Sequence, residues 1–201
     1  MGSVGALGLL ALRQRARRAA AALALASATS AAPAAADPPG HIRFTASNLV
    51  STARGEFRDW KVVHAQVDEA EPARSRVEVE VALASIDTGI GLRDDDLRGS
   101  GFLDVARFPT ASVLLEGFRL EGTDGFSCSV TLELHGQRKL FPMQFRIEDR
   151  AARRIRGSVT LDRRDYGVGA PFSRWNPLSP DDSVLVEVEA TVPPNGMSGT
   201  P

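Results

Sequence analysis

Residues 77–109, VEVEVALASIDTGIGLRDDDLRGSGFLDVARFP, contain the clearest strand pattern in the chain, followed by a turn and a short polar segment. Residues 77–83 alternate apolar positions with the charged side chains of Glu78 and Glu80. A period of two is typical of a β-strand with one buried and one solvated face. Asp87-Thr88-Gly89 ends the alternation, because Asp and Thr bond nearby backbone and glycine tolerates positive φ. The run therefore predicts a long strand that ends in a turn.

The acidic residues Asp94–Asp96 follow this turn and predict a short helix around residues 91–100. Carboxylates are favourable there because the first turn of a helix has free N–H groups and a positive dipole end. We expect these carboxylates to be solvated. Phe102, Leu103 and Phe108 provide an apolar underside that should pin the segment to the core.

Similar alternation recurs through the rest of the chain. Extended runs are predicted at 41–46, 51–57, 60–67, 74–86, 111–120, 126–134, 140–147, 155–161 and 184–188. The run at 60–67 is mixed in polarity, Gly55 indicates a bend or bulge in its strand, and His135-Gly136 indicates a hairpin turn. We count about eight long strands and no βαβ rhythm, which leaves a sandwich or a barrel. The sequence favours an all-β fold with a single eight-stranded antiparallel barrel, because closure removes exposed edges.

Composition restricts the class of protein. With 201 residues the chain fits one domain, and a formal net charge of −1 gives no basic field for nucleic acid. The single cysteine, Cys128, excludes an internal disulfide framework, and we expect it to act as a small buried hydrophobe.

The N-terminal segment resembles a secretory signal. A basic cluster at 13–18 precedes an apolar stretch at 19–28 and the small residues Ala34-Ala35-Ala36. That order predicts a signal peptide over 1–36, cleaved after Ala36, and hence a periplasmic or secreted protein without stable membrane insertion. Arg17-Arg18 leaves twin-arginine export open, and an uncleaved anchor is the alternative. The predicted domain is 37–192, followed by a Pro/Gly-rich tail at 193–201 that we expect to be disordered.

The sequence contains few patterns typical of catalytic or metal-binding sites. His41, His64 and His135 have no ligand partners at metal-binding spacing, so we expect solvent-facing strand or turn residues and no metal. Asp94–Asp96 lack the glycine and distal glutamate of a calcium loop. The sequence contains no Gly-x-Ser-x-Gly elbow and no phosphate-cradling glycine loop. We therefore expect no enzyme activity and no cofactor.

Asp87-Thr88-Gly89 raises one catalytic alternative, a homodimeric aspartic protease that uses Asp87. Ser85 and Ile90 depart from the usual surroundings of that motif. The competing interpretation is a strand-ending turn in which Asp87 bonds its own backbone.

The apolar strand faces leave two states of the interior open. An eight-stranded barrel is either filled by its own side chains or holds one slender ligand. Inward positions would include Val79, Val81, Leu83, Val113, Leu115, Leu132, Met143 and Phe145. Each methylene that enters such a tunnel gains ~0.8 kcal/mol, so a long apolar chain would suit it.

Four ordered segments resemble the YceI-like family of lipocalin-like, polyisoprenoid-binding periplasmic proteins. They are Ala84–Gly89 with Arg93-Asp94, Leu97, Phe102, Asp104 and Phe108-Pro109; Ser51–Phe57; Leu132–Gly136 with Lys139; and Leu161–Gly169. The resemblance spans about residues 41–192. It implies a barrel that encloses an amphiphile such as a quinone or a prenyl phosphate, and a homodimer in many members.

The resemblance and the apolar pattern together give a predicted function, a binding protein that sequesters or transports an isoprenoid-like lipid. The alternative is a ligand-free structural or inhibitory β-domain. The predicted tunnel lining comprises Phe44, Phe57, Trp60, Val81, Leu83, Phe102, Phe108, Leu115, Leu132, Met143 and Phe145, with Phe102 and Phe108 covering one end. Departures from the family pattern at His41, Asp96 and Gly101–Leu103 are expected to lie near the barrel mouth and to affect head-group preference.

Overall fold

The computed structural model describes residues 40–173, 175–176 and 179–192. The signal peptide predicted over 1–36 and the tail predicted over 193–201 lie outside the described residues. Within the described part, no helix has the length and apolar character needed to cross a membrane.

The described chain is almost entirely β-structure, and its strands form one antiparallel sheet. The strands are β1 (Gly40–Ser47), β2 (Thr52–Phe57), β3 (Trp60–Gln66), β4 (Arg76–Ala82), β5 (Ile86–Asp87), β6 (Thr110–Leu120), β7 (Gly125–Leu134), β8 (Gln137–Asp149), β9 (Arg154–Asp162) and β10 (Ser183–Thr191). The helices are the α-helix α2 (Gly91–Arg98) and the 3-10 turns η1 (Pro72–Arg74), η2 (Leu83–Ser85) and η3 (Arg163–Tyr166).

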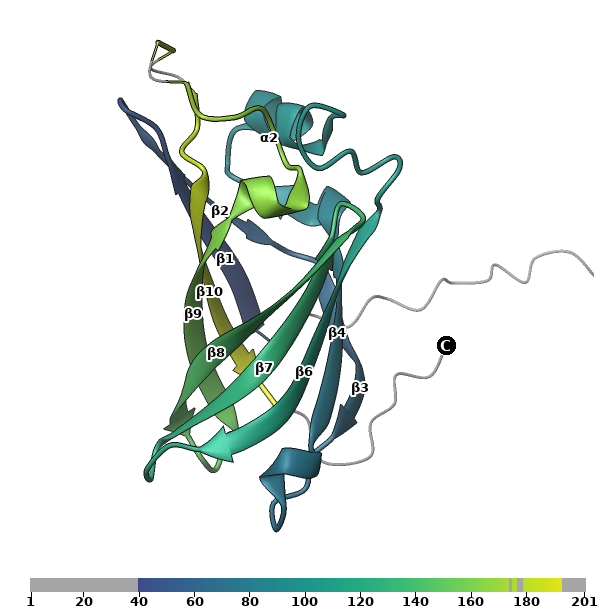
Figure 1. Cartoon of the computed structure of the whole chain (residues 1–201), viewed down its shortest axis with the longest axis vertical. Coiled ribbons are helices and arrows are strands. Elements are labelled where there is room, and N and C mark those ends of the chain that lie inside the picture. Colours follow the sequence, from purple (N-terminus) through teal and green to yellow (C-terminus); the bar gives the residue numbers. More distant parts are fainter. Residues whose placement is uncertain (1–39, 174, 177–178, 193–201) are drawn as a thin grey trace, which may run out of the picture. The chain divides into compact units, whose positions relative to one another are not determined.

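Strand order explains how the sheet curls into a barrel. The order is β3-β4-β6-β7-β8-β9-β10-β1-β2-β5. Because Arg58-Asp59 alone joins β2 to β3, the chain links the first strand of this order to the strand next to its other end. Two backbone hydrogen bonds fix the β2–β3 connection: Arg58 N–H donates to the Ser85 carbonyl (3.3 Å), and Ala82 N–H donates to the Asp59 carbonyl (3.0 Å). Figure 1 shows the strands curling around a common interior, with α2 at one end and η1 at the other.

The all-β barrel and the helix near 91–100 are confirmed, but the strand count is ten where about eight were expected. The run predicted over 74–86 is interrupted by η2, so its end becomes the separate two-residue strand β5. The hairpin turn at His135-Gly136 is confirmed, with φ of 51° and 74°. Such paired positive φ values suit the right-handed twist of the flanking strands.

Alternation sets the register and places the apolar face inside. In the β4–β6 pair, Val79 lies opposite Val113 and Val77 opposite Leu115. In the next pair, Val113 lies opposite Leu132. A slip by one residue would turn these side chains to the solvent, so burial of one face fixes the register.

Two strand glycines make room for aromatic rings. A Cβ at Gly55 would lie 2.6 Å from the Phe44 ring, and one at Gly157 would lie 2.7 Å from the Phe145 ring. The register of β1 with β2 is regular through Gly55, so a bulge at that residue is wrong. The glycine is instead needed for close approach of a ring from the neighbouring strand.

Gly157→Ala should therefore lower the free energy of unfolding by about 1–3 kcal/mol, because the added methyl overlaps the Phe145 ring. Urea unfolding followed by circular dichroism measures the change. Gly91→Ala is the matched control, since a Cβ at Gly91 meets no atom within 4 Å. Equal stability of the Gly157 variant and the wild type would contradict the packing described.

Candidate ligand-binding cavity

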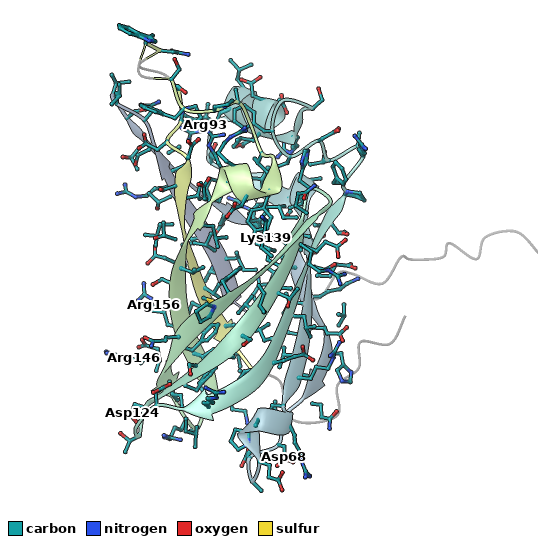
Figure 2. The ribbon with its side chains drawn as sticks, viewed as in Figure 1. Asp68, Arg93, Asp124, Lys139, Arg146 and Arg156 are labelled. Atoms are coloured by element: carbon teal, nitrogen blue, oxygen red, sulfur yellow. The ribbon has the colours of Figure 1, made fainter. Side chains whose placement is uncertain are left out.

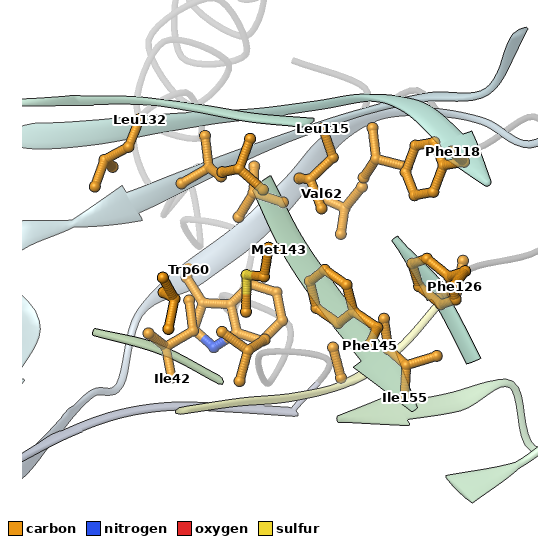
Figure 3. Close-up of a pocket in the computed structure, with 18 of the residues that line it drawn as sticks. Ile42, Trp60, Val62, Leu115, Phe118, Phe126, Leu132, Met143, Phe145 and Ile155 are labelled. Carbon is orange, nitrogen blue, oxygen red and sulfur yellow. The ribbon is translucent and has the colours of Figure 1, made fainter. Parts of the chain in front are cut away.

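The curled sheet encloses a cavity of about 760 Å³. Aliphatic and aromatic side chains from β1, β2, β3, β4 and β6–β10 line most of it, as the close-up in Figure 3 shows. This volume lies within the ~300–1,000 Å³ typical of ligand pockets. Of the two interiors that the sequence left open, the described barrel has the hollow one.

The structure brings together eight of the eleven predicted lining residues. Phe57, Trp60, Val81, Leu83, Leu115, Leu132, Met143 and Phe145 border the cavity. All eight side chains line the same cavity, and their contact with a ligand stays a prediction.

The other three predicted lining residues lie elsewhere. Phe44 packs against Phe57, with ring centroids 5.8 Å apart, in the cluster that fills the α2 end of the barrel. Phe102 packs against the same cluster and does not border the cavity. Phe108 lies against His135 on a separate surface cleft, with a centroid distance of 4.5 Å. All three rings are half-buried, and their apolar character alone did not show which part of the interior is empty.

Several lining residues were not among those predicted. Ile42, Val62, Phe118, Phe126, Val130, Ile155, Val159, Val186 and Val188 also border the cavity. The same alternation that identified Leu132 could have identified Phe126 and Val130, because all three lie on one face of β7.

One end of the cavity is polar and forms its mouth. The polar lining residues within the described chain are Asp68, Glu69, Ser75, Arg150, Arg153 and Thr191. The first three belong to the β3–β4 connection, the two arginines to the β8–β9 turn, and Thr191 ends β10. Glu69 and Arg153 approach across this mouth to 3.3 Å. In Figure 2, Asp68 lies at the end of the barrel opposite Arg93, which is on α2.

The position of the mouth corrects part of the sequence interpretation. His41, at the start of β1, pairs with the last residues of β10 and so lies at the mouth end. Asp96 is on α2, and Leu103 is buried in the cluster at the opposite end. The departures at Asp96 and Gly101–Leu103 are therefore remote from the mouth, because α2 covers the closed end.

A buried arginine holds the closed end together. Arg163 is 7% exposed, and its guanidinium donates to the carbonyls of Asp181 (2.9 Å), Val168 (2.7 Å) and Pro180 (2.9 Å) and to Asp182 Oδ1 (2.8 Å). Burial lowers the pKa of Arg163 from its usual value, and nearby Asp182 opposes that shift. The side chain thereby ties η3 to the segment before β10. The sequence does not predict the burial of Arg163, because its neighbours in the chain do not distinguish it from the other arginines.

The helix α2 is anchored by a second buried charge. Asp94 is 6% exposed and accepts hydrogen bonds from the N–H (2.9 Å) and the hydroxyl of Thr88. The expectation that all three carboxylates of Asp94–Asp96 are solvated is wrong for Asp94, because its side chain turns back to the preceding loop. The hydroxyl bond from Thr88 is the main cause that lowers the pKa of Asp94, and burial opposes it.

The remaining reactive groups have ordinary structural roles. Asp87 accepts from Gly89 N–H (2.7 Å), as the turn interpretation predicts, and also pairs with Arg58 (2.7 Å). Cys128 is buried, and burial raises its pKa to about 11, so it remains a neutral thiol near pH 7. His135 is half-buried instead of solvent-facing and bonds the Tyr166 carbonyl (3.2 Å). Among the described residues, no group of three His, Cys, Asp or Glu could hold a metal ion.

These features define a class: a lipocalin-like β-barrel whose apolar cavity opens at one polar mouth. The family model for the YceI-like domain matches residues 35–192, and the chain belongs to the YceI-like family. A UPF0312 protein of Azotobacter vinelandii is 30% identical over 158 residues, covering 74% of this chain and 79% of the relative. A UPF0312 protein of Pseudomonas syringae pv. syringae is 30% identical over 140 residues, covering 65% and 71%.

Solved structures share the fold at low identity. Burkholderia cenocepacia BcnA superposes with a TM-score of 0.67 at 16% identity, covering 75% of this chain and 94% of that one. A polyisoprenoid binding domain from Saccharophagus degradans gives 0.55 at 18% identity, covering 76% and 92%. The YCEI protein of Campylobacter jejuni gives 0.57 at 18% identity, covering 72% and 88%.

Asp94 should make stability depend on pH in a defined direction. Its pKa is lower in the folded state, so ionised Asp94 stabilises the fold above the ordinary carboxyl pKa of ~3.9, and this stabilisation is lost as the pH falls below it. The difference in unfolding free energy between wild type and Asp94→Asn should therefore be largest near neutral pH and shrink below pH ~4. Urea unfolding at several pH values measures it, with the exposed Asp96→Asn as control. A difference that grows on acidification would contradict the assignment.

Proposed function

We propose that this protein is an exported carrier that encloses the apolar chain of an isoprenoid-like amphiphile. The observation that carries the proposal is the cavity of about 760 Å³ with an apolar wall and polar groups gathered at one mouth. A long hydrocarbon chain gains ~0.8 kcal/mol for each methylene it moves from water into such a space. Affinity can then come from the chain, with little demand on specific polar contacts.

The charges at the mouth favour a polar but uncharged outer end of the ligand, such as a quinone or an alcohol. Arg153 pairs with Glu69 at 3.3 Å, and Arg150 lies 3.8 Å from Asp124. Because each arginine already has a carboxylate neighbour, the mouth offers little excess positive charge to a prenyl phosphate. A neutral head could accept hydrogen bonds there while it remains hydrated.

The comparisons support the class of ligand. The Saccharophagus degradans domain that shares this fold is described as polyisoprenoid-binding. Export to the periplasm is part of the proposal, and the basic cluster, apolar stretch and Ala34-Ala35-Ala36 support it. The cavity is lined by one chain, so a homodimer, if formed, would not be needed to complete it.

The two alternatives explain less of the geometry. A ligand-free structural domain gives no reason for a cavity of this size, since protein interiors normally pack closely. A protease built on Asp87 would need that carboxylate in a substrate cleft. Asp87 instead bonds Gly89 and Arg58, and it does not border the cavity.

Filling the cavity tests the proposal. Val113→Trp adds an indole to the inner face of β6, and we expect it to reduce the lipid bound per chain at least severalfold, because the ring occupies the space of the ligand. Ser112→Trp is the matched control, since Ser112 is exposed and its side chain lies on the other face of the strand. Native mass spectrometry of the purified chain, before and after incubation with a long-chain prenyl alcohol, measures occupancy.

The same spectra can reject the carrier. Wild type and Ser112→Trp should each show one added lipid per chain after the incubation. Empty spectra for all three proteins, with circular dichroism showing that each is folded, would leave the ligand-free domain as the better account.

A further inference from the structure

A second, basic cleft lies outside the apolar cavity. It forms where the segment before β6, the β7–β8 turn and η3 meet, and it is lined by Arg107, Phe108, His135, Gln137 and Arg164 together with residues of η3. Among the residues that the structure describes, none lines both the basic cleft and the cavity. The proposed carrier function assigns no role to the basic cleft.

A chain of contacts fixes the wall of the basic cleft. Arg107 Cζ lies 5.0 Å from the centroid of the Phe108 ring, and that ring lies 4.5 Å from the ring of His135. His135 Nδ1 lies 3.2 Å from the Tyr166 carbonyl, which can only accept, so this nitrogen carries the hydrogen. A Cβ at Gly136 would lie 3.0 Å from Phe108, so the turn needs glycine for this ring to pack.

The charges around the basic cleft are not balanced. Within the described chain, neither the Arg107 guanidinium nor the Arg164 guanidinium lies within 4.0 Å of a carboxylate, whereas many other arginines there form ion pairs. The backbone N–H of Arg164 donates to Asp162 Oδ1 (2.8 Å). Arg164 donates one N–H to the Gly169 carbonyl. Asp165 also borders the cleft, but Lys139 lies 3.7 Å from its carboxylate. Two arginines and a lysine therefore share this region with the two carboxylates of Asp162 and Asp165, and neither carboxylate pairs with an arginine of the cleft.

We propose that the basic cleft binds a phosphate-type oxyanion. Each guanidinium presents five N–H donors in a planar fork that matches phosphate oxygens, and only one donor of Arg164 is used by a described neighbour. An anion between the two like charges also relieves their repulsion. Arg107 is held in place over Phe108, so less side-chain freedom is lost when an anion binds.

The anion belongs to a different molecule from the lipid in the cavity. The polar mouth is formed by the β3–β4 connection and the β8–β9 turn, whereas the basic cleft lies at the β7–β8 turn. The buried cluster of Ile86, Leu103, Tyr166 and Val168 fills the α2 end of the barrel, next to η3. Free phosphate compounds and the head groups of membrane lipids both offer the required chemistry.

Titration with inorganic phosphate tests the site. In nitrogen-15 NMR spectra of the mature chain at low salt, the amides of Gly136 and Gly167 should shift and saturate. Arg107→Gln and Arg164→Gln should each weaken phosphate binding by roughly tenfold, because a charge-assisted hydrogen bond is lost. Arg146→Gln is the matched control, because Arg146 is exposed on β8 seven residues after Lys139, which is ~23 Å along a strand. Figure 2 labels both residues and shows Arg146 further from the α2 end than Lys139.

A second arm separates the two sources of the anion. Sedimentation with vesicles of phosphatidylcholine, with or without phosphatidic acid, measures membrane binding. Phosphate saturation without sedimentation assigns a free anion, and sedimentation that requires phosphatidic acid and Arg107 assigns a lipid head group. No saturable shift together with no sedimentation would overturn the proposal, as would equal losses in all three variants. Unchanged amide spectra away from the cleft show that each variant is folded.

Discussion

A sheet that curls on itself turns one face of every strand inward, and the alternation along the strands makes that face apolar. The inward side chains must either fill the interior or surround an apolar cavity, in which water would be poorly hydrogen-bonded. In this barrel they do both. The α2 end is packed by the cluster around Ile86 and Tyr166, while the space between Trp60 and the β8–β9 turn stays open. The barrel therefore has a packed, closed end and an open end that forms the mouth of the cavity.

Buried charged residues stabilise the closed end, and exposed ion pairs lie at the mouth. Arg163 satisfies four acceptors at the closed end, and Asp94 ties α2 to the turn after β5. Losing either would leave buried polar groups without partners, which costs more than the net value of the bonds themselves. At the mouth the ion pairs are exposed and individually weak, so they can rearrange when a ligand passes.

Local pattern was enough to predict the strands, the short helix and the His135-Gly136 turn, because each depends on residues close in sequence. Eight of the predicted lining residues border the cavity for the same reason: alternation determines which face turns inward. Alternation does not determine how far along the barrel the hollow extends, so it predicts that Phe44 and Phe102 line the cavity, although both pack the closed end. Nor could it find Arg163, whose burial depends on carbonyls contributed by residues 168–181.

The most direct measurement uses the two tryptophans of the chain. Trp60 borders the cavity, whereas Trp175 is 89% exposed. In a Trp175→Phe variant the emission of Trp60 should be quenched saturably, at about one equivalent, by a long-chain prenyl quinone that enters the cavity. In a Trp60→Phe variant, Trp175 should show no saturable quenching. Trp60 emission that does not respond to the quinone, or that is quenched only as Trp175 is, would contradict the claim that the barrel encloses a lipid.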